Sequence, residues 1–174
     1  VALINPCDLC VGGNTAIPED SCASVMDIDG NIYNTIIIGN QAWMVENLKV
    51  TRFRDGTLIP MAYGPEWVNL ETSAFNVYYE YENNQQFSRY GNLYNWFAVN
   101  DTLKIAPEGW HIPTDDEWKI LEKTLGVEER DLDSLSWRGT DTGGKLKGTG
   151  FEYWESPNTG ATNETGFTAI PGEY

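Results

Sequence analysis

A run of strand and turn signals between residues 27 and 48 constrains the fold of this chain more than any other stretch. The segment DIDGNIYNTIIIGNQAWMVENL contains Asp29-Gly30 and Gly39-Asn40, two dipeptides typical of tight hairpin turns. A β-branched run ending at Ile38 lies between them, and a short apolar stretch around Trp43 follows. We therefore expect a meander of short antiparallel strands.

The first of these turns also fits the beginning of a calcium-binding loop. Asp27, Asp29 and Asn31 alternate as the first ligands of such a loop do, but the acid that should close it is replaced by Ile36. A plain hairpin turn is therefore the preferred interpretation. A calcium site at Asp27, Asp29 and Asn31 stays open as the weaker hypothesis, and no other cofactor is expected.

The stretch EGWHIPTDDEWKILEKTLG has the features of a capped helix. Thr114 and Glu117 are spaced as a capping box, in which each side chain bonds a backbone N–H of the first turn. Gly126 stands where a left-handed residue often ends a helix. The apolar stripe between these ends consists of Trp118, Leu121 and Leu125. We expect a helix that begins after Thr114 and packs this stripe into the core.

His111, just before this helix, is the only histidine of the chain. It has no cysteine, second histidine or serine-based motif beside it, and the neighbouring acids already serve the helix start. We interpret His111 as a hydrogen-bonded structural residue. Because no nucleophile–base pair or metal cluster can be assembled from these residues, we expect no enzymatic activity.

The composition restricts the classes of partner. The chain has 174 residues and a formal net charge of −15, which repels nucleic acid and anionic lipid. Its longest aliphatic run, around residues 36–38, is far too short to cross a bilayer. The length suits one domain with an appendage.

The three cysteines, Cys7, Cys10 and Cys22, lie among polar residues and glycines at the start of the chain. We interpret residues 1–24 as an appendage or linker and residues 25–174 as the folded domain. A redox motif or half a zinc site is an alternative, but no fourth ligand or strand–helix context supports it. We expect one disulfide among the three cysteines, and therefore a secreted or outer-surface location.

Aromatic residues are concentrated in NVYYEYENNQQFSRYGNLYNWFAVN. Its first tyrosines have strand character, and Leu93, Trp96 and Phe97 fit one face of a short helix. Such rings either fill a core or contact a sugar or a protein partner. The candidates for ligand or partner contacts are Tyr78, Tyr79, Tyr81 and Trp154.

The segment GTDTGGKL differs from a phosphate-binding loop by one critical residue. Leu146 replaces the hydroxyl residue that would hold magnesium, and Asp141 puts an acid inside the loop. We reject a nucleotide site and interpret the glycines as turns. These glycines are Gly143, Gly144, Gly148 and Gly150. Asn163 begins a glycosylation sequon, NET.

Five stretches in a fixed order carry a resemblance to a known family. They are DIDGNIYNTIIIGNQAWMVENLKVTRFRDGTLIP, YGNLYNWFAV, APEGWHIPTDDEWKIL, GGKLKGTGFEYWESPNTGATNETGF and TAIPG. Together they resemble the Fibrobacter succinogenes major paralogous domain over residues 26–172. The resemblance implies a surface or secreted protein with an α+β, C-type-lectin-like fold, few helices, short antiparallel strands and long loops. It also implies a distant relationship to formylglycine-generating enzymes.

The chain departs from the family pattern at two places. Ala42 stands where members often have a cysteine, and the Gly-rich and Trp-rich strands that usually follow residue 172 are missing. We expect the domain to be incomplete at its C-terminus. An oxidase like the formylglycine generators is disfavoured because no cysteine lies after Cys22. The expected function is non-catalytic binding of a protein or a glycan; the alternative is an architectural subunit of a surface assembly.

Overall fold

The computed structural model of the protein describes residues 24–77, 90–135 and 138–172. Two small antiparallel sheets and several short helices form an α+β fold, as expected. The first sheet is the meander of β1 (Ser24–Met26), β2 (Ile32–Ile38) and β3 (Gln41–Met44), in that order. Both hairpins are confirmed, and Gly39 has the positive φ of 63° that a two-residue hairpin turn needs at its first position.

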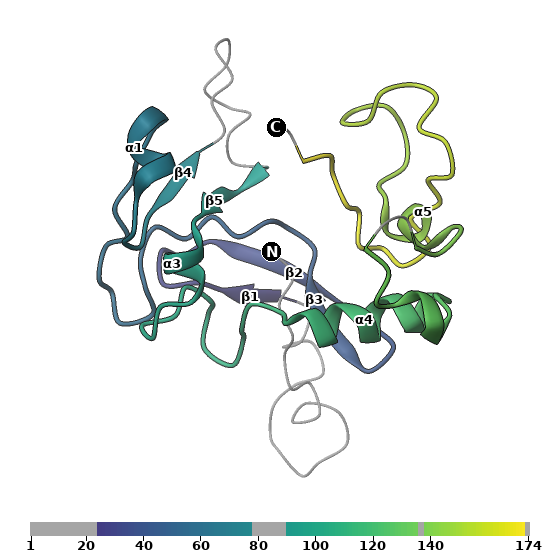
Figure 1. The fold of residues 1–174 in the computed structure, drawn as a ribbon, viewed down its shortest axis with the longest axis horizontal. Helices are drawn as coiled ribbons and strands as arrows, with labels where there is room; N and C mark the ends of the chain where they lie inside the picture. Colours follow the sequence, from purple (N-terminus) through teal and green to yellow (C-terminus); the bar gives the residue numbers. More distant parts are fainter. Residues whose placement is uncertain (1–23, 78–89, 136–137, 173–174) are drawn as a thin grey trace.

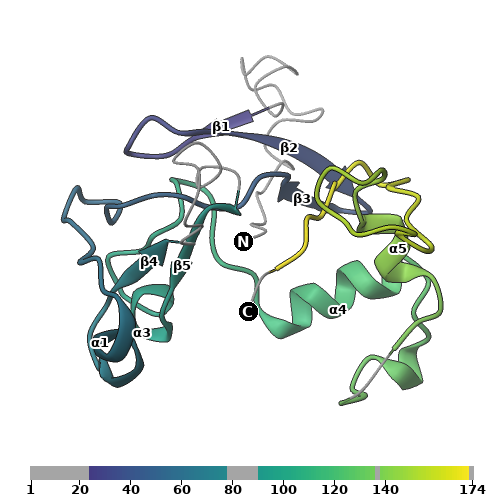
Figure 2. The same cartoon turned by 90° about the horizontal axis from the view of Figure 1, so that it is seen from above.

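The remaining elements form two groups on either flank of this sheet (Figures 1 and 2). One flank contains α1 (Gly64–Asn69), β4 (Phe75–Val77), β5 (Asn92–Tyr94) and α3 (Trp96–Val99). The other contains α4 (Asp115–Thr124), the 3₁₀ turn η3 (Glu129–Asp131) and α5 (Thr142–Leu146). Strands β4 and β5 pair antiparallel as the second sheet.

Strand β3 connects the two halves of the core. All four of its residues are buried, although it has only one partner strand among the described residues. Successive side chains of a strand point to opposite faces. Ala42 and Met44 pack into the larger apolar cluster with Tyr33, whereas Trp43 packs against Leu121 of α4. Both faces of this short strand are therefore covered.

The helix predicted from the capping box is confirmed as α4. The Thr114 hydroxyl accepts a hydrogen bond from the Glu117 N–H, and the Glu117 carboxylate accepts one from the Thr114 N–H. Leu121 is fully buried, and the Trp118 ring lies 4.8 Å from the Trp43 ring between centroids. The helix stops before Gly126, whose φ is 106°.

Two local predictions were wrong. Leu93 does not share a helical face with Trp96 and Phe97, because it lies in β5 and the helix begins only after Asn95. Gly143 and Gly144 lie inside α5 rather than in turns. A Cβ on Gly144 would come within 2.0 Å of the Gly160 carbonyl oxygen, so close packing against the backbone explains that glycine.

Several predictions concern residues outside the described ranges. The disulfide candidates Cys7, Cys10 and Cys22 are among them, and so are the aromatic candidates Tyr78, Tyr79 and Tyr81. Of the helices within those ranges, none has the length and apolar character required to span a bilayer.

Candidate functional site

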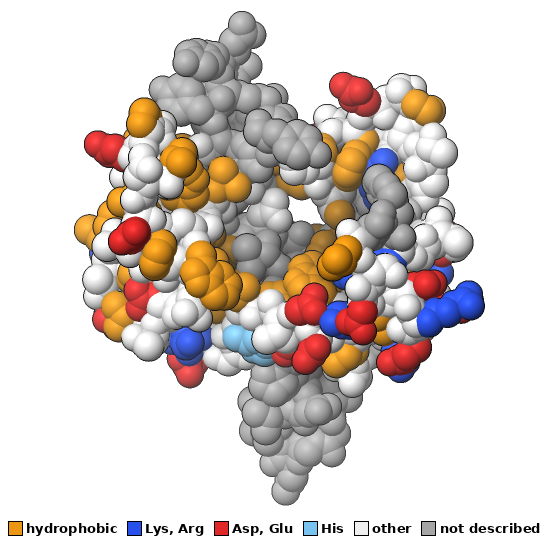
Figure 3. Space-filling model, viewed as in Figure 1, with side chains coloured by type: hydrophobic (Ala, Val, Ile, Leu, Met, Phe, Trp, Pro, Cys, Tyr) orange, Lys and Arg blue, Asp and Glu red, His pale blue; other side chains and the backbone are white. Residues whose placement is uncertain are grey.

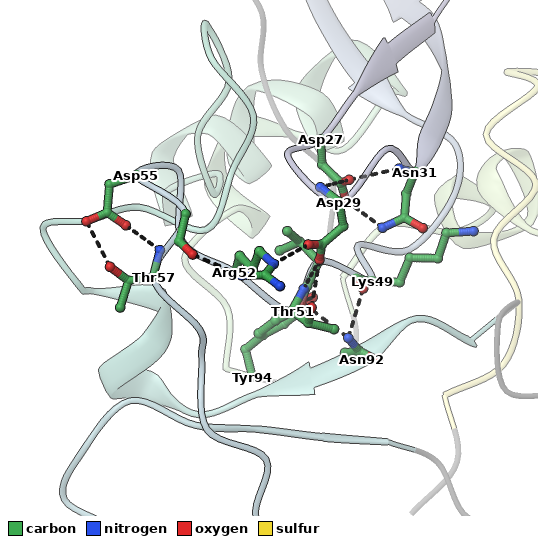
Figure 4. Close-up of polar contacts among 12 residues, drawn as sticks. Asp27, Asp29, Asn31, Lys49, Thr51, Arg52, Asp55, Thr57, Asn92 and Tyr94 are labelled. Carbon is green, nitrogen blue, oxygen red and sulfur yellow. Dashed lines mark hydrogen bonds and ion pairs between the residues drawn. The ribbon is translucent and has the colours of Figure 1, made fainter.

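The acids of the first hairpin form a structural network rather than an open ligand set (Figure 4). Asp27 is buried, and its carboxylate accepts hydrogen bonds from the Asp29 N–H at 3.0 Å and the Asn31 N–H at 2.9 Å. It also accepts one from the Asn31 side-chain amide and one from the Tyr33 hydroxyl, at 2.6 Å. Burial, with the bond to Asp27, raises the pKa of Tyr33, so this hydroxyl remains a donor. The Asp27 carboxylate thus closes the turn.

The side chain of Asp29 does not bond within the turn as that of Asp27 does, but contacts the segment that follows the sheet. Its carboxylate accepts hydrogen bonds from the N–H and the hydroxyl of Thr51 and forms an ion pair with Arg52 at 3.3 Å (Figure 4). In the described ranges no three His, Cys, Asp or Glu side chains are grouped as a metal site. The three calcium candidates lie close together, but the carboxylate oxygens of Asp27 and Asp29 already accept hydrogen bonds from the hairpin and its neighbouring loop, and the Asn31 amide donates to Asp27.

A groove lies between α3 and the start of α4 in the described part of the chain. Its cavity has a volume of about 640 Å³, within the range of about 300–1,000 Å³ typical of small-molecule sites. All its lining residues come from positions 96–115, and the floor is apolar. The floor residues are Val99, Ile105, Ala106, Trp110 and Ile112.

Trp96 forms one wall of this groove and is 69% exposed. It lies on the one-turn helix α3, which the side chain of Asn95 holds in place. The side-chain oxygen Oδ1 of Asn95 accepts hydrogen bonds from the N–H groups of Ala98 and Ala74, and its side-chain Nδ2 donates to the Thr72 carbonyl. Ala98 is fully buried, so the helix is fixed on the inside and presents its aromatic residues outward.

The opposite wall consists of His111, Pro113, Thr114 and Asp115. His111 Nε2 lies 2.8 Å from Glu117 Oε1, which confirms the expected hydrogen-bonded role. Burial acts to raise the pKa of Glu117, but its bonds from Thr114 and His111 outweigh burial and lower that pKa. The capping box therefore fixes both the helix start and the imidazole. Figure 3 shows this histidine, the only one in the chain, on the surface near exposed apolar side chains.

Arg54 fixes the loop that forms the floor. Its guanidinium donates hydrogen bonds to the carbonyl oxygens of Ala106, Pro107 and Trp110, at 2.9–3.0 Å. A smaller cavity of about 310 Å³ lies on the Arg54 side of this loop. The Arg54 guanidinium is already bonded to three carbonyl oxygens and paired with Glu108. It is therefore less available to bind a ligand in this smaller cavity.

The sequence model of the Fibrobacter succinogenes major domain matches residues 36–174, which is most of the chain. The chain belongs to this family. The resemblance read from the motifs is therefore confirmed. No curated protein and no solved structure matches the chain.

In this Fibrobacter succinogenes major domain, two of the stretches that carry the family resemblance build the groove. YGNLYNWFAV supplies β5 and α3, and APEGWHIPTDDEWKIL supplies the floor around Trp110 and the wall at the start of α4. The stretch GGKL forms part of α5, where the Lys145 ammonium donates to the Leu125 carbonyl at the end of α4. Lys145 thus stabilises the C-terminal end of α4.

Trp154 makes contacts within its own domain. Of the four aromatic residues predicted to contact a ligand, it is the one that lies in the described ranges. Its indole N–H donates to the Ala169 carbonyl at 3.0 Å, and the Lys147 ammonium lies 4.0 Å from the ring centroid. Asn163 of the sequon is also bonded, through its side chain, to Thr168. These residues organise the C-terminal loops and lie outside the groove.

Sequence reasoning missed the groove residues Trp96, Asn100 and Lys104 as site candidates. One signal was present, because Asn95 is a favoured N-cap residue directly before the aromatic pair. This cap indicates that a helix begins at Trp96, so that Trp96 and Phe97 belong to a different element from the aromatic residue of the preceding strand.

Proposed function

We propose that the protein is a non-catalytic binding module, secreted or on the outer cell surface, that holds a glycan or a protein segment in the groove between α3 and α4. The observation that carries the proposal is the exposure of the large Trp96 side chain in the lining of the groove. Large apolar side chains exposed on a concave surface are typical of ligand contacts. The rigid support of α3 by Asn95 favours binding because little order must be gained on association.

His111 has a structural role in this proposal. In the part of the chain that the structure describes, its one hydrogen-bond partner is the capping-box carboxylate of Glu117. General base catalysis on a bound nucleophile needs such an imidazole within hydrogen-bond reach of a hydroxyl or thiol. For the fold we propose the C-type-lectin-like topology that the family resemblance implies; the short strands and long loops agree with it.

Binding of the purified protein to cell-surface fractions tests this function. Immobilised polysaccharide and surface-protein fractions are probed by biolayer interferometry with the wild type, Trp96→Ala and Phe151→Ala. Phe151 is a matched control, because it is 66% exposed but does not line the groove. We expect Trp96→Ala alone to lose binding. Equal binding by Trp96→Ala and the wild type contradicts the proposal.

An architectural role is the second candidate, and α1 favours it. None of the residues of α1 is buried, and Val68 is 80% exposed. Met61 and Tyr63, just before the helix, are also exposed. In this case Val68→Asp should remove a stoichiometric protein partner seen by native mass spectrometry, whereas Trp96→Ala should retain it.

A further inference from the structure

The groove between α3 and α4 also indicates the chemistry of its ligand, an inference that rests on the proposed function. Trp96 lines the groove, and 69% of its surface is exposed. A pyranose ring has a complementary face of C–H groups and a rim of hydroxyls. Stacking on an aromatic ring buries the first and leaves the second free for hydrogen bonds.

Polar side chains that could bond such hydroxyls also line the groove. Asn100, Lys104 and Asp115 all line the groove and are exposed. Within the described residues, the Asn100 amide and the Lys104 ammonium make no hydrogen bond or ion pair. The Asp115 side chain is 73% exposed, although one oxygen pairs with Lys119. These groups supply both donors and acceptors, which a hydroxyl requires because it acts as both.

The charges of the groove favour a neutral ligand. Lys104 and Asp115 are the lining residues with a formal charge at neutral pH, one of each sign, and Asp115 is also paired with Lys119 at 2.8 Å. The whole chain carries a formal charge of −15, which repels acidic sugars and phosphates. A cationic ligand would be repelled by the Lys104 ammonium in the groove lining.

The groove also lacks the features of a peptide site that adds a strand to a sheet. Its lining residues lie in α3, in the loop of residues 100–114 and at the first position of α4, and none lies in a strand of the described residues. An extended peptide needs a row of backbone partners, such as a free strand edge provides. Here the polar partners are side chains around an aromatic ring.

We propose that the groove binds neutral oligosaccharides built of hexopyranose units, with Trp96 stacked on one ring and Asn100, Lys104 and Asp115 bonded to its hydroxyls. Isothermal titration calorimetry tests this with cellohexaose, laminarihexaose, maltohexaose and mannohexaose as neutral probes. Sialyllactose and oligogalacturonate are the acidic probes. At least one neutral probe should bind, and the acidic probes should bind more weakly.

Variants connect the binding to the groove. Trp96→Ala should raise the Kd for the neutral probe about tenfold or more, a change of about 1.4 kcal/mol. Trp96→Phe should retain part of the affinity, because it keeps a smaller ring. Asn100→Ala should weaken binding, whereas the control Phe151→Ala should not. Circular dichroism and thermal unfolding confirm that each variant is folded.

The outcomes separate this proposal from the proposed function. A surface protein bound through Trp96, with no neutral sugar bound, overturns the glycan assignment and leaves the binding module in place. Preference for the acidic probes overturns the neutral class. If neither sugars nor proteins bind in a Trp96-dependent manner, both proposals are wrong.

Discussion

Asp27→Ala should lower the free energy of unfolding by about 3 kcal/mol. The change removes a buried carboxylate that accepts four hydrogen bonds. The Tyr33 hydroxyl, in a fully buried side chain, loses a charged acceptor, and such a bond contributes about 1.5–3 kcal/mol. The other three donors lie at the turn, where water can replace the carboxylate, so each adds less.

Thermal and urea unfolding measure this loss, which corresponds to a decrease in Tm of about 6–12 °C for a chain of this length. Asp55→Ala is the matched control. Asp55 also accepts bonds from a residue two positions ahead, Thr57, but it is exposed, so we expect a cost below about 1 kcal/mol. A similar small cost for both variants refutes the reasoning.

The same experiment decides between a hydrogen-bonded turn and a calcium site. If the carboxylate of Asp27 serves the turn alone, adding calcium or a chelator should leave the Tm of the wild type unchanged. A metal that binds the native state raises the free energy of unfolding as its concentration increases. A calcium-dependent Tm that is lost in Asp27→Ala therefore restores the calcium hypothesis.

Four further predictions concern α4, α5 and the N-terminal segment. Thr114→Ala should cost about 0.5–2 kcal/mol in chemical unfolding by removing the helix cap. The folded pKa of Glu117 lies below its ordinary value of 4.5, so its ionised carboxylate stabilises the fold above that pH, and this stabilisation is lost as the pH falls through the lowered pKa. Glu117→Gln should therefore flatten the acid side of the profile of unfolding free energy against pH. An unchanged profile contradicts this prediction. Gly144→Ala should destabilise α5 strongly in thermal unfolding, since the new Cβ meets the backbone, whereas Gly143→Ala has open space and should be tolerated; equal effects would argue against the close approach. Alkylation without reductant, followed by mass spectrometry, should find at most one free thiol, and three labelled cysteines end the disulfide hypothesis.

Features set by neighbouring residues were predictable from the sequence. The hairpin turns and the capping box depend on a few residues each, and the structure confirms Gly39, Thr114 and Glu117 in those roles. The burial of Leu121 also followed from helical spacing alone.

Features set by distant parts of the chain were not predictable. The need for glycine at position 144 of α5 comes from the close approach of Gly160, which no local pattern reveals. Similarly, both faces of β3 are buried because two separate flanks pack against it. The groove needed both kinds of information: its walls begin at recognisable caps, but the floor depends on the bonds from Arg54 to a loop some fifty residues away.

The continuity of the groove in the sequence affects how such a domain can evolve. Every lining residue lies between positions 96 and 115, and this segment is anchored by Asn95 at one end and by the capping box at the other. Asn100 and Lys104 hold the local backbone through their main-chain groups, but their exposed side chains form no hydrogen bond or ion pair in the described ranges. Under the proposed binding function, substitutions in a few adjacent codons would change the ligand preference, while the rest of the domain stays under constant selection for stability.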